Sequence, residues 1–153
     1  MMNILFLCTG NTCRSPMAEL YFNRLMELKK APHTAASAGL SACTGGPISD
    51  HSFQVMQAEG IDASGFRSSA VTRYALEEAD LIICMTQGHL RSLLSVCPEY
   101  RQKTHTLLEW TGGNDVPDPF GGDLALYRNT FETMRTALEK LAEDLCSQGE
   151  TNP

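Results

Sequence analysis

Along the chain, runs of continuously apolar residues alternate with segments in which apolar residues recur every three or four positions. Residues 3–7 are apolar after Asn3, and residues 81–85 form a second run, as expected for strands covered on both faces. Residues 34–38 and 104–107 are shorter strand candidates. The pattern therefore predicts four strands separated by helical segments.

Four segments have helical spacing. The first covers residues 15–29, with Ser15 as its N-cap and Pro16 at its first helical position. Residues 48–59 and 87–95 are the next two. The last helix is the longest, and its apolar residues form one stripe: Leu124, Tyr127, Phe131, Met134, Leu138, Leu141 and Leu145.

Strands that alternate with helices are typical of a parallel sheet with helices on both faces, so the predicted fold is α/β with three layers, α/β/α. A single domain is expected over residues 1–148, followed by a loose C-terminal tail at residues 149–153. Ligands bind such sheets beyond the carboxyl ends of the strands. Cys8 ends the first strand, so we expect the functional site there.

Composition narrows the class of protein. Of 153 residues, 42% are hydrophobic and 20% are charged, as in ordinary globular domains. The net charge of −6 argues against a nucleic-acid partner or a membrane surface. The N-terminal residues contain no basic leader and no segment is long enough to span a membrane, so a cytoplasmic location is expected.

The cysteines favour a reducing compartment over a disulfide framework, because the chain can form a core and carries no secretion signal. They are Cys8, Cys13, Cys43, Cys84, Cys97 and Cys146. None belongs to a Cys-x-x-Cys pair of the kind used for zinc binding or thioredoxin-type exchange. We expect no metal and no cofactor.

The loop after the first strand has the composition of an anion-binding site. Gly10 and Asn11 tolerate positive φ, which lets successive backbone N–H groups turn inward. The following helix directs its positive end at the same place, and Arg14 adds a fork that matches phosphate oxygens. These features also favour a thiolate at Cys8, to which Ser15 could donate a hydrogen bond. The plainer alternative is a buried, inert cysteine beside a surface arginine.

Phosphoryl transfer also needs an acid to protonate the leaving group. The best candidate is Asp118 in the segment Val-Pro-Asp-Pro-Phe-Gly-Gly, where prolines stiffen the loop and Phe120 offers an apolar wall. By itself such a segment is more often a simple turn. Its occurrence together with Cys8-x5-Arg14 favours the catalytic interpretation.

These residues resemble the low-molecular-weight protein tyrosine phosphatases. The resemblance rests on Cys8-Thr-Gly-Asn-Thr-Cys-Arg-Ser15 and on Asp118-Pro119, and it covers nearly the whole chain. It implies a four-stranded parallel sheet flanked by helices. It also implies that Cys8 forms a phosphocysteine intermediate, that Arg14 clamps the phosphate, and that Asp118 is first a general acid and then a general base.

The resemblance assigns further roles in the loop. It implies that the phosphate is bound by Thr9, Gly10, Asn11, Thr12, Cys13, Arg14 and Ser15. Asn11, bonded to Ser37, would hold the loop in a left-handed turn, and Ser15 would support the thiolate. Cys13 is a family position that can form a reversible disulfide with Cys8, which would protect the nucleophile from over-oxidation. The alternative is that Cys13 has no redox role.

Three features resemble a subgroup, the protein-arginine phosphatases, more than the tyrosine-directed members: Thr12, the segment from Asp118 to Gly122, and Met85-Thr86. Thr12 stands where tyrosine-directed members usually carry a bulkier aliphatic residue, and Phe120 stands where they commonly have tyrosine. A phosphoguanidine is polar, and the hydroxyl of Thr12 could accept its N–H groups. We therefore expect Thr12 and Phe120 to set substrate selectivity, with phosphorylated proteins as substrates. A counteracting protein-arginine kinase is implied by the resemblance alone.

Four other functions remain open at this point. One is a general low-molecular-weight tyrosine phosphatase, and another is an arsenate reductase that uses Cys8 with Cys84 and Cys97. A third is a phosphocysteine carrier, which would need neither the Arg14 clamp nor the Asp118 acid. The fourth is a catalytically silent phosphoprotein-binding module. The four histidines have no visible catalytic partner, so we expect ordinary structural roles for them.

Overall fold

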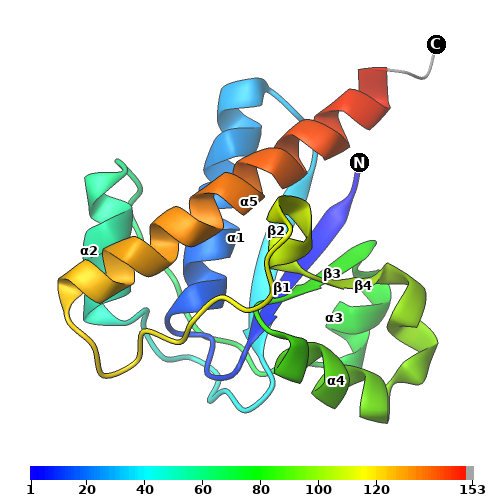
Figure 1. The fold of residues 1–153 in the computed structure, drawn as a ribbon, viewed down its shortest axis with the longest axis horizontal. Helices are drawn as coiled ribbons and strands as arrows, with labels where there is room; N and C mark the ends of the chain where they lie inside the picture. Colours follow the sequence, from blue (N-terminus) through cyan, green and yellow to red (C-terminus); the bar gives the residue numbers. More distant parts are fainter. Residues whose placement is uncertain (151–153) are drawn as a thin grey trace.

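A computed structural model describes residues 1–150 of the chain (Figure 1). Its four strands form one sheet in the order β2-β1-β3-β4, and every neighbouring pair is parallel. The strands are β1 (Asn3–Cys8), β2 (Thr34–Gly39), β3 (Leu81–Cys84) and β4 (Thr104–Thr106). The predicted four-stranded parallel sheet is confirmed, with each strand end within one residue of its expected position.

Helices cover both faces of this sheet. They are α1 (Arg14–Lys29), α2 (Asp50–Ala58), α3 (Arg73–Glu78), α4 (Gln87–Val96) and α5 (Leu124–Glu150), with 3₁₀-helices η1 (Pro98–Lys103) and η2 (Leu107–Thr111). Side chains of β1 alternate between two cores: Ile4, Phe6 and Cys8 join residues of α1, α2 and α5, whereas Leu5 and Leu7 join residues of α3 and α4. The three-layer prediction is therefore confirmed.

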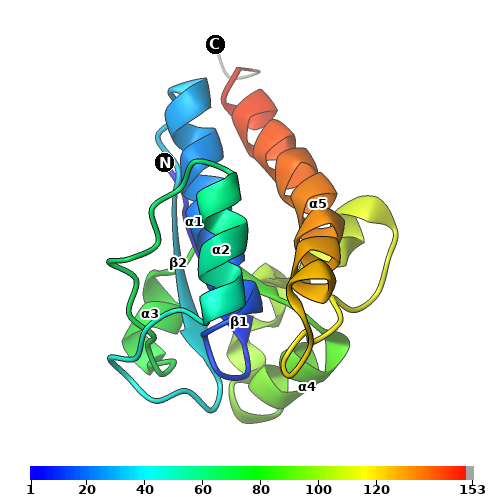
Figure 2. The ribbon, with the colours of Figure 1, turned by 90° about the vertical axis from the view of Figure 1, so that its left-hand side faces the viewer.

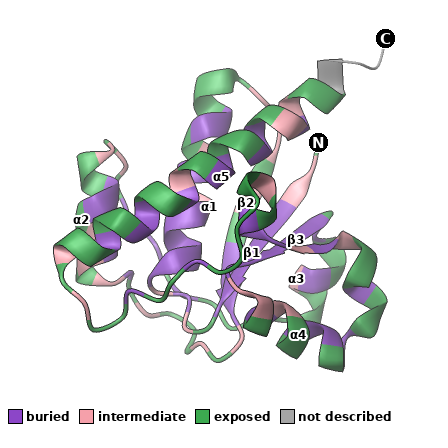
Figure 3. Cartoon of the chain, viewed as in Figure 1, coloured by how far each residue is buried: buried purple, intermediate pink, exposed green. Residues whose placement is uncertain are grey.

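The layers differ in size. On the larger side, α1, α2 and α5 pack against one another (Figure 2). Strands β1, β3 and β4 are mostly buried between the layers, and β2 is buried only in its second half, while the outer faces of the helices are exposed (Figure 3). None of the helices in residues 1–150 has the length and apolarity needed to cross a membrane.

The start of α1 differs from the prediction. The helix begins at Arg14, after Cys13, and no side chain caps it, so Ser15 lies inside the first turn and is not the N-cap. The hydroxyl of Ser15 is occupied by tertiary contacts with Cys8 and Asn11. Pro16 is accommodated because the first turn of a helix has no intrahelical acceptors for its N–H groups.

Two other boundaries were wrong, and one short α-helix was not predicted. Helix α2 begins at Asp50, later than expected, because the side chain of Ser49 accepts the N–H of Ser52 and caps it. The six-residue α3 was not predicted, since so short a helix shows no apolar period. Helix α5 continues through Glu150, so residues 149–150 are not part of a loose tail. The remainder of the predicted tail, residues 151–153, lies outside the described residues.

Candidate active site

Strand β1, the following loop and the start of α1 surround a pocket of about 260 Å³ at the carboxyl end of the sheet. Its lining is composed of the predicted loop residues and the predicted acid segment: Cys8, Thr9, Gly10, Thr12, Cys13, Arg14, Asp118 and Phe120. Segments more than 100 residues apart in sequence thus meet at one pocket. Asn11 and Ser15 lie behind it, fully buried.

The thiol of Cys8 is almost fully buried, and its Sγ lies 2.8 Å from Oγ of Ser15. The Ser15 oxygen also accepts a hydrogen bond from Nδ2 of Asn11 at 2.8 Å. Because Asn11 supplies one hydrogen to this oxygen, the single hydroxyl hydrogen of Ser15 is free to be donated to the sulfur. This arrangement suits a thiolate at Cys8, because a thiolate can accept a hydrogen bond but cannot donate one.

Asn11 has φ of 56°, the left-handed conformation that the resemblance implies. Its Nδ2 also donates to Oγ of Ser37 at 2.9 Å, and its Oδ1 accepts the N–H of Ser69 at 2.8 Å. Of the two loop residues that tolerate positive φ, only Asn11 adopts it, since the φ of Gly10 is not positive. A single left-handed residue is enough to reverse the chain at this point.

Sequence reasoning missed Glu19, which supports this network from α1. Oγ of Ser37 donates to Oε1 of Glu19 at 2.8 Å. Burial raises the pKa of Glu19, and the hydrogen bonds from Ser37 oppose the shift. The hydrogen-bond chain therefore runs from Glu19 through Ser37 and Asn11 to the Ser15 hydroxyl beside Cys8.

The last residue of β2 lets that strand touch the loop. A Cβ added to Gly39 would lie 2.6 Å from the carbonyl oxygen of Thr9 and 3.0 Å from the nitrogen of Asn11. Residues after Gly39 hold the loop from the same side: the N–H of Leu40 donates to the Cys8 carbonyl, and that of Ser41 to the Thr9 carbonyl, each at 2.9 Å. Glycine is required here by close approach of two backbones.

Arg14 connects the loop to the acid segment. Its side chain is 6% exposed, and Nη1 donates to the Val116 carbonyl at 2.9 Å. Its Nη2 lies 3.7 Å from Oδ2 of Asp118, whose side chain is 57% exposed. Oδ1 of Asp118 accepts the N–H of Phe120 at 3.1 Å, while the Phe120 ring is 82% exposed at the pocket wall. A fixed cation thus faces an accessible carboxyl.

Cys13 lines the same pocket, and its thiol lies 3.4 Å from the hydroxyl of Tyr127 and 3.5 Å from Oγ of Ser49. Burial, together with Cys13, raises the pKa of Tyr127 to about 12. Sequence reasoning had placed Tyr127 only in the apolar stripe of α5, because its polar end has no sequence signal. Cys8 and Cys13 are free thiols here, so a redox role for them stays a prediction.

His89 was expected to have an ordinary structural role, but it contacts the loop. Its Nε2 lies 2.8 Å from Oγ1 of Thr9, the residue after Cys8. Burial and, to a smaller extent, the charge of Arg14 lower the pKa of His89. Nothing in the local sequence around His89 indicated this contact.

The two other cysteines considered for redox chemistry lie on the opposite face of the sheet. Cys84 and Cys97 belong to the core beneath α3 and α4, whereas Cys8 belongs to the core beneath α1 and α5. Burial raises the pKa of Cys84 to about 12, which disfavours its reactive thiolate. Within residues 1–150, no group of three or more histidine, cysteine or acidic residues is arranged to hold a metal ion.

Comparisons with known proteins find similar sequences over most of the chain. Residues 3–151 match the family model described as low molecular weight phosphotyrosine protein phosphatase. The chain is 38% identical over 146 residues to the protein-arginine-phosphatase of Bacillus subtilis, covering 94% of this chain and 97% of that protein. It is 32% identical over 139 residues to the low molecular weight protein-tyrosine-phosphatase Wzb of Salmonella typhi, covering 91% and 88%.

Solved structures are equally similar. The YwlE arginine phosphatase from Geobacillus stearothermophilus superposes with a TM-score of 0.91 at 36% identity, covering 100% of this chain and 98% of that one. A YwlE arginine phosphatase mutant with a phosphorylated active-site serine gives a TM-score of 0.90 at 38% identity, covering 94% and 95%.

Proposed function

This chain belongs to the low molecular weight phosphotyrosine protein phosphatase family, and from that premise we propose that it hydrolyses phosphoarginine residues in proteins. The observation that carries the choice of substrate is Thr12, a small hydroxyl-bearing residue in the lining of the pocket beside Cys8. The similarity to arginine phosphatases supports the same choice. The activity is that of a cysteine-dependent phosphatase.

In the first step, the thiolate of Cys8 attacks phosphorus, an S–P bond forms, and the N–P bond of phosphoarginine breaks. Asp118 gives its proton to the departing guanidine nitrogen, which otherwise would leave as a strong base. The exposure of Asp118 and its place in the lining of the same pocket as Cys8 support this role.

In the second step, water attacks phosphorus and the S–P bond breaks. Asp118, now a carboxylate, takes a proton from the water, and Cys8 leaves as a thiolate. The Ser15 hydroxyl donates to the departing sulfur, since its oxygen is already held by Asn11. A covalent intermediate is consistent with the phosphorylated active-site serine of the similar YwlE mutant.

The phosphoryl oxygens are held by Arg14 and by the backbone of residues 9–15. With Nη1 fixed by the Val116 carbonyl, the guanidinium keeps one orientation before substrate arrives. Such preorganisation stabilises the transition state at no cost of rearrangement during the reaction. Asn11, Ser15 and Ser37 keep the loop in shape from behind.

Substrate choice is proposed to depend on Thr12 and Phe120 at the pocket mouth. A guanidine leaving group presents N–H donors, and the Thr12 hydroxyl is an acceptor that an aliphatic residue lacks. The exposed Phe120 ring favours a second candidate, phosphotyrosine, because an aromatic leaving group can pack against it. Phosphotyrosine is therefore the alternative substrate.

The test is kcat/KM on two peptides of identical sequence, one with phosphoarginine and one with phosphotyrosine, with Cys8→Ser as the blank. We expect preference for phosphoarginine by at least tenfold, about 1.4 kcal/mol in transition-state binding. A preference for phosphotyrosine would leave the mechanism intact and replace the substrate. A phosphocysteine that persists without turnover would instead indicate a carrier.

The physiological setting is part of the proposal. Substrates would be proteins phosphorylated on arginine, so a protein kinase that transfers phosphoryl groups to arginine must supply them. Cytoplasmic action is proposed because a nucleophilic thiol is best preserved in a reducing compartment. The thiol, carboxyl and guanidinium supply the required chemistry, so no metal or cofactor is included in this mechanism.

A further inference from the structure

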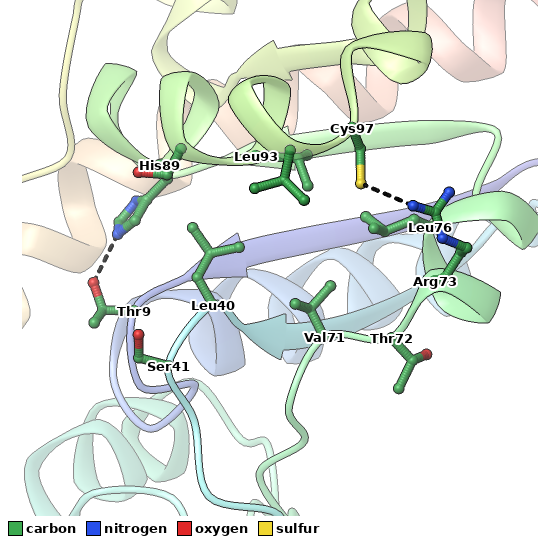
Figure 4. Close-up of a pocket in the computed structure, with 12 residues that line it drawn as sticks. Thr9, Leu40, Ser41, Val71, Thr72, Arg73, Leu76, His89, Leu93 and Cys97 are labelled. Atoms are coloured by element: carbon green, nitrogen blue, oxygen red, sulfur yellow. Dashed lines mark hydrogen bonds between the residues drawn. The ribbon is translucent and has the colours of Figure 1, made fainter.

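Both nitrogens of the His89 imidazole make contacts between α4 and the proposed phosphate-binding loop, residues 8–15, which is called the phosphate loop below (Figure 4). Nε2 lies 2.8 Å from Oγ1 of Thr9, and Nδ1 lies 2.9 Å from Oγ1 of Thr86. The oxygen of Thr86 also accepts the backbone N–H of His89 as the N-cap of α4. The side chain therefore has little freedom to turn.

These contacts assign the tautomer of the ring. Burial and the charge of Arg14 lower the pKa of His89, while Asp115 and Asp118 oppose the shift, so the neutral form of the ring is favoured. The Thr86 oxygen already accepts a backbone N–H, so its hydroxyl hydrogen is available to Nδ1. The remaining Nε2–H then donates to Thr9, an assignment made from the hydrogen-bond network.

Thr9 is the only residue between the nucleophile Cys8 and Gly10, and it lines two cavities. One is the catalytic pocket, and the other is a groove of about 530 Å³ between α4 and the segments that follow β2 and precede α3. Figure 4 shows the Thr9–His89 bond closing one end of that groove. The Thr9 carbonyl is bonded on the other side by the N–H of Ser41. The loop is thus held from the β2 side and from the α4 side.

We propose that His89 is a positioning residue for phosphoryl transfer at Cys8, and that it acts through the hydroxyl of Thr9. The hydrogen bond fixes the loop directly after the nucleophile, whereas the Asn11 network fixes its far half. A displacement of about 1 Å in a reacting group can lower a rate by about 10²-fold, so loss of one of several anchors is expected to cost about tenfold. The inference rests on the phosphatase activity proposed above and is independent of the choice between phosphoarginine and phosphotyrosine.

The test is a double-mutant cycle with Thr9→Val, His89→Leu and both changes together, assayed on p-nitrophenyl phosphate. We expect each single change to lower kcat by about tenfold with KM altered less than about threefold, because positioning acts on the transition state. The double variant is expected to lose about tenfold as well, since both changes break the same bond. Losses that multiply to about a hundredfold, or a wild-type kcat in His89→Leu, would overturn the proposal.

Conservative variants separate positioning from general support of the fold. Thr9→Ser keeps the hydroxyl, and His89→Gln keeps an N–H donor toward Thr9, so both are expected within about threefold of wild type. Ser92→Ala is the matched control, because Ser92 lies one turn further along α4 on the same groove and is exposed. Equal losses in the conservative and disruptive variants would overturn the proposal.

If His89→Leu melts below the assay temperature, the comparison of Thr9→Val with Thr9→Ser decides the question. Thr9 is exposed, so its replacement is not expected to unfold the protein.

Failure of this inference is distinguishable from failure of the proposed function. Wild-type activity no greater than that of Cys8→Ser on p-nitrophenyl phosphate and on both phosphopeptides would overturn both. An active wild type whose kcat is unchanged by Thr9→Val and His89→Leu would overturn only the role of His89.

Discussion

Arg14 and Val116 are joined by a hydrogen bond of 2.9 Å from the guanidinium to the carbonyl oxygen, which connects the first turn of α1 to the segment that carries Asp118. The same guanidinium lies 3.7 Å from the Asp118 carboxyl. Arg14, the proposed phosphate clamp, therefore also holds the segment that carries the proposed proton donor, so we expect a change at Arg14 to affect both binding and proton transfer.

Replacing Arg14 by lysine keeps the charge but removes the planar fork. A lysine ammonium cannot hold the Val116 carbonyl and two phosphoryl oxygens in fixed directions. We expect Arg14→Lys to lower kcat/KM on p-nitrophenyl phosphate by about 10²–10³-fold, comparable to loss of an anion-stabilising donor. Arg24→Lys, on the exposed part of α1, is the control and should match wild type. Retention of activity within fivefold would contradict the role of the fork.

Thr12→Ile tests the proposed basis of selectivity. Isoleucine removes the hydroxyl acceptor and adds apolar surface that packs against an aromatic ring. We expect kcat/KM for a phosphoarginine peptide to fall by at least tenfold and that for a phosphotyrosine peptide to rise by about tenfold. Thr12→Val, which removes the hydroxyl at nearly constant volume, separates polarity from size. An unchanged ratio of the two constants in Thr12→Ile would show that selectivity is set elsewhere.

Gly39→Ala tests the close approach of β2 to the loop. The new methyl group would overlap the Thr9 carbonyl and the Ala42 side chain, both 2.6 Å from the ideal Cβ. We expect a loss of about 1–3 kcal/mol in the free energy of unfolding, typical of overpacking, measured by urea denaturation. Activity should fall further than this stability loss explains, because the displaced atoms belong to the phosphate loop.

Gly65→Ala is the matched control for that substitution. Gly65 has no neighbour within 4 Å of an added Cβ and no positive φ, so its replacement should leave both activity and stability within experimental error of wild type. Equal effects at Gly39 and Gly65 would rule out the contact with the loop as the cause.

Glu19→Gln tests the buried carboxyl behind the loop. Burial raises the folded-state pKa of Glu19 above its usual 4.5, so the folded chain binds this proton more tightly than the unfolded chain does. The contribution of Glu19 to the free energy of unfolding therefore falls as pH rises from 4.5 through the folded-state pKa. Glutamine keeps an acceptor for Ser37 without the charge, so the variant should gain stability relative to wild type as pH increases.

Urea denaturation of wild type and Glu19→Gln at pH 4 and pH 7 measures this difference. Glu27→Gln, an exposed change on the same helix, is the control for a general effect of charge. A stability difference that is the same at both pH values would contradict the buried, shifted carboxyl.

Cys13→Ala tests the predicted protective disulfide. Peroxide converts the Cys8 thiolate to a sulfenic acid, and condensation with the Cys13 thiol would release water and form a reducible S–S bond. We expect wild type to recover activity after treatment with dithiothreitol, whereas Cys13→Ala should not. Cys43→Ala, which removes an exposed cysteine, should recover like wild type. Equal recovery of wild type and Cys13→Ala would exclude the protective role.

Local sequence patterns were sufficient for the sheet and for the segments that form the pocket. Continuous apolar runs located β1 and β3, and the shorter candidates at residues 34–38 and 104–107 located β2 and β4. The residues from Cys8 to Ser15 and around Asp118 do line or support one pocket. Strand patterns and short motifs involve residues that are close together in sequence, so they can be recognised without knowledge of the structure. The start of α1 could not be predicted, because the Ser15 hydroxyl that usually caps a helix is occupied by Cys8.

The residues that were missed have partners far away in the chain. His89 meets Thr9 across 80 positions, and Tyr127 meets Cys13 across 114. Glu19 is closer to Ser37, 18 positions away, but the contact needs β2 beside α1. A histidine or glutamate on a helix looks the same in sequence whether it faces solvent or a catalytic loop. Only the packing of the elements distinguishes the two.

Arg14 and Ser15 are at once the first residues of α1 and members of the phosphate loop. The backbone of α1 therefore sets the positions of these two residues, and α1 itself packs in the larger core. Loss of the backbone geometry at Arg14 and Ser15 therefore requires fraying of the first turn of α1. We expect this part of the site to stay formed for as long as α1 does, so that loss of phosphate binding during denaturation should accompany unfolding of that helix.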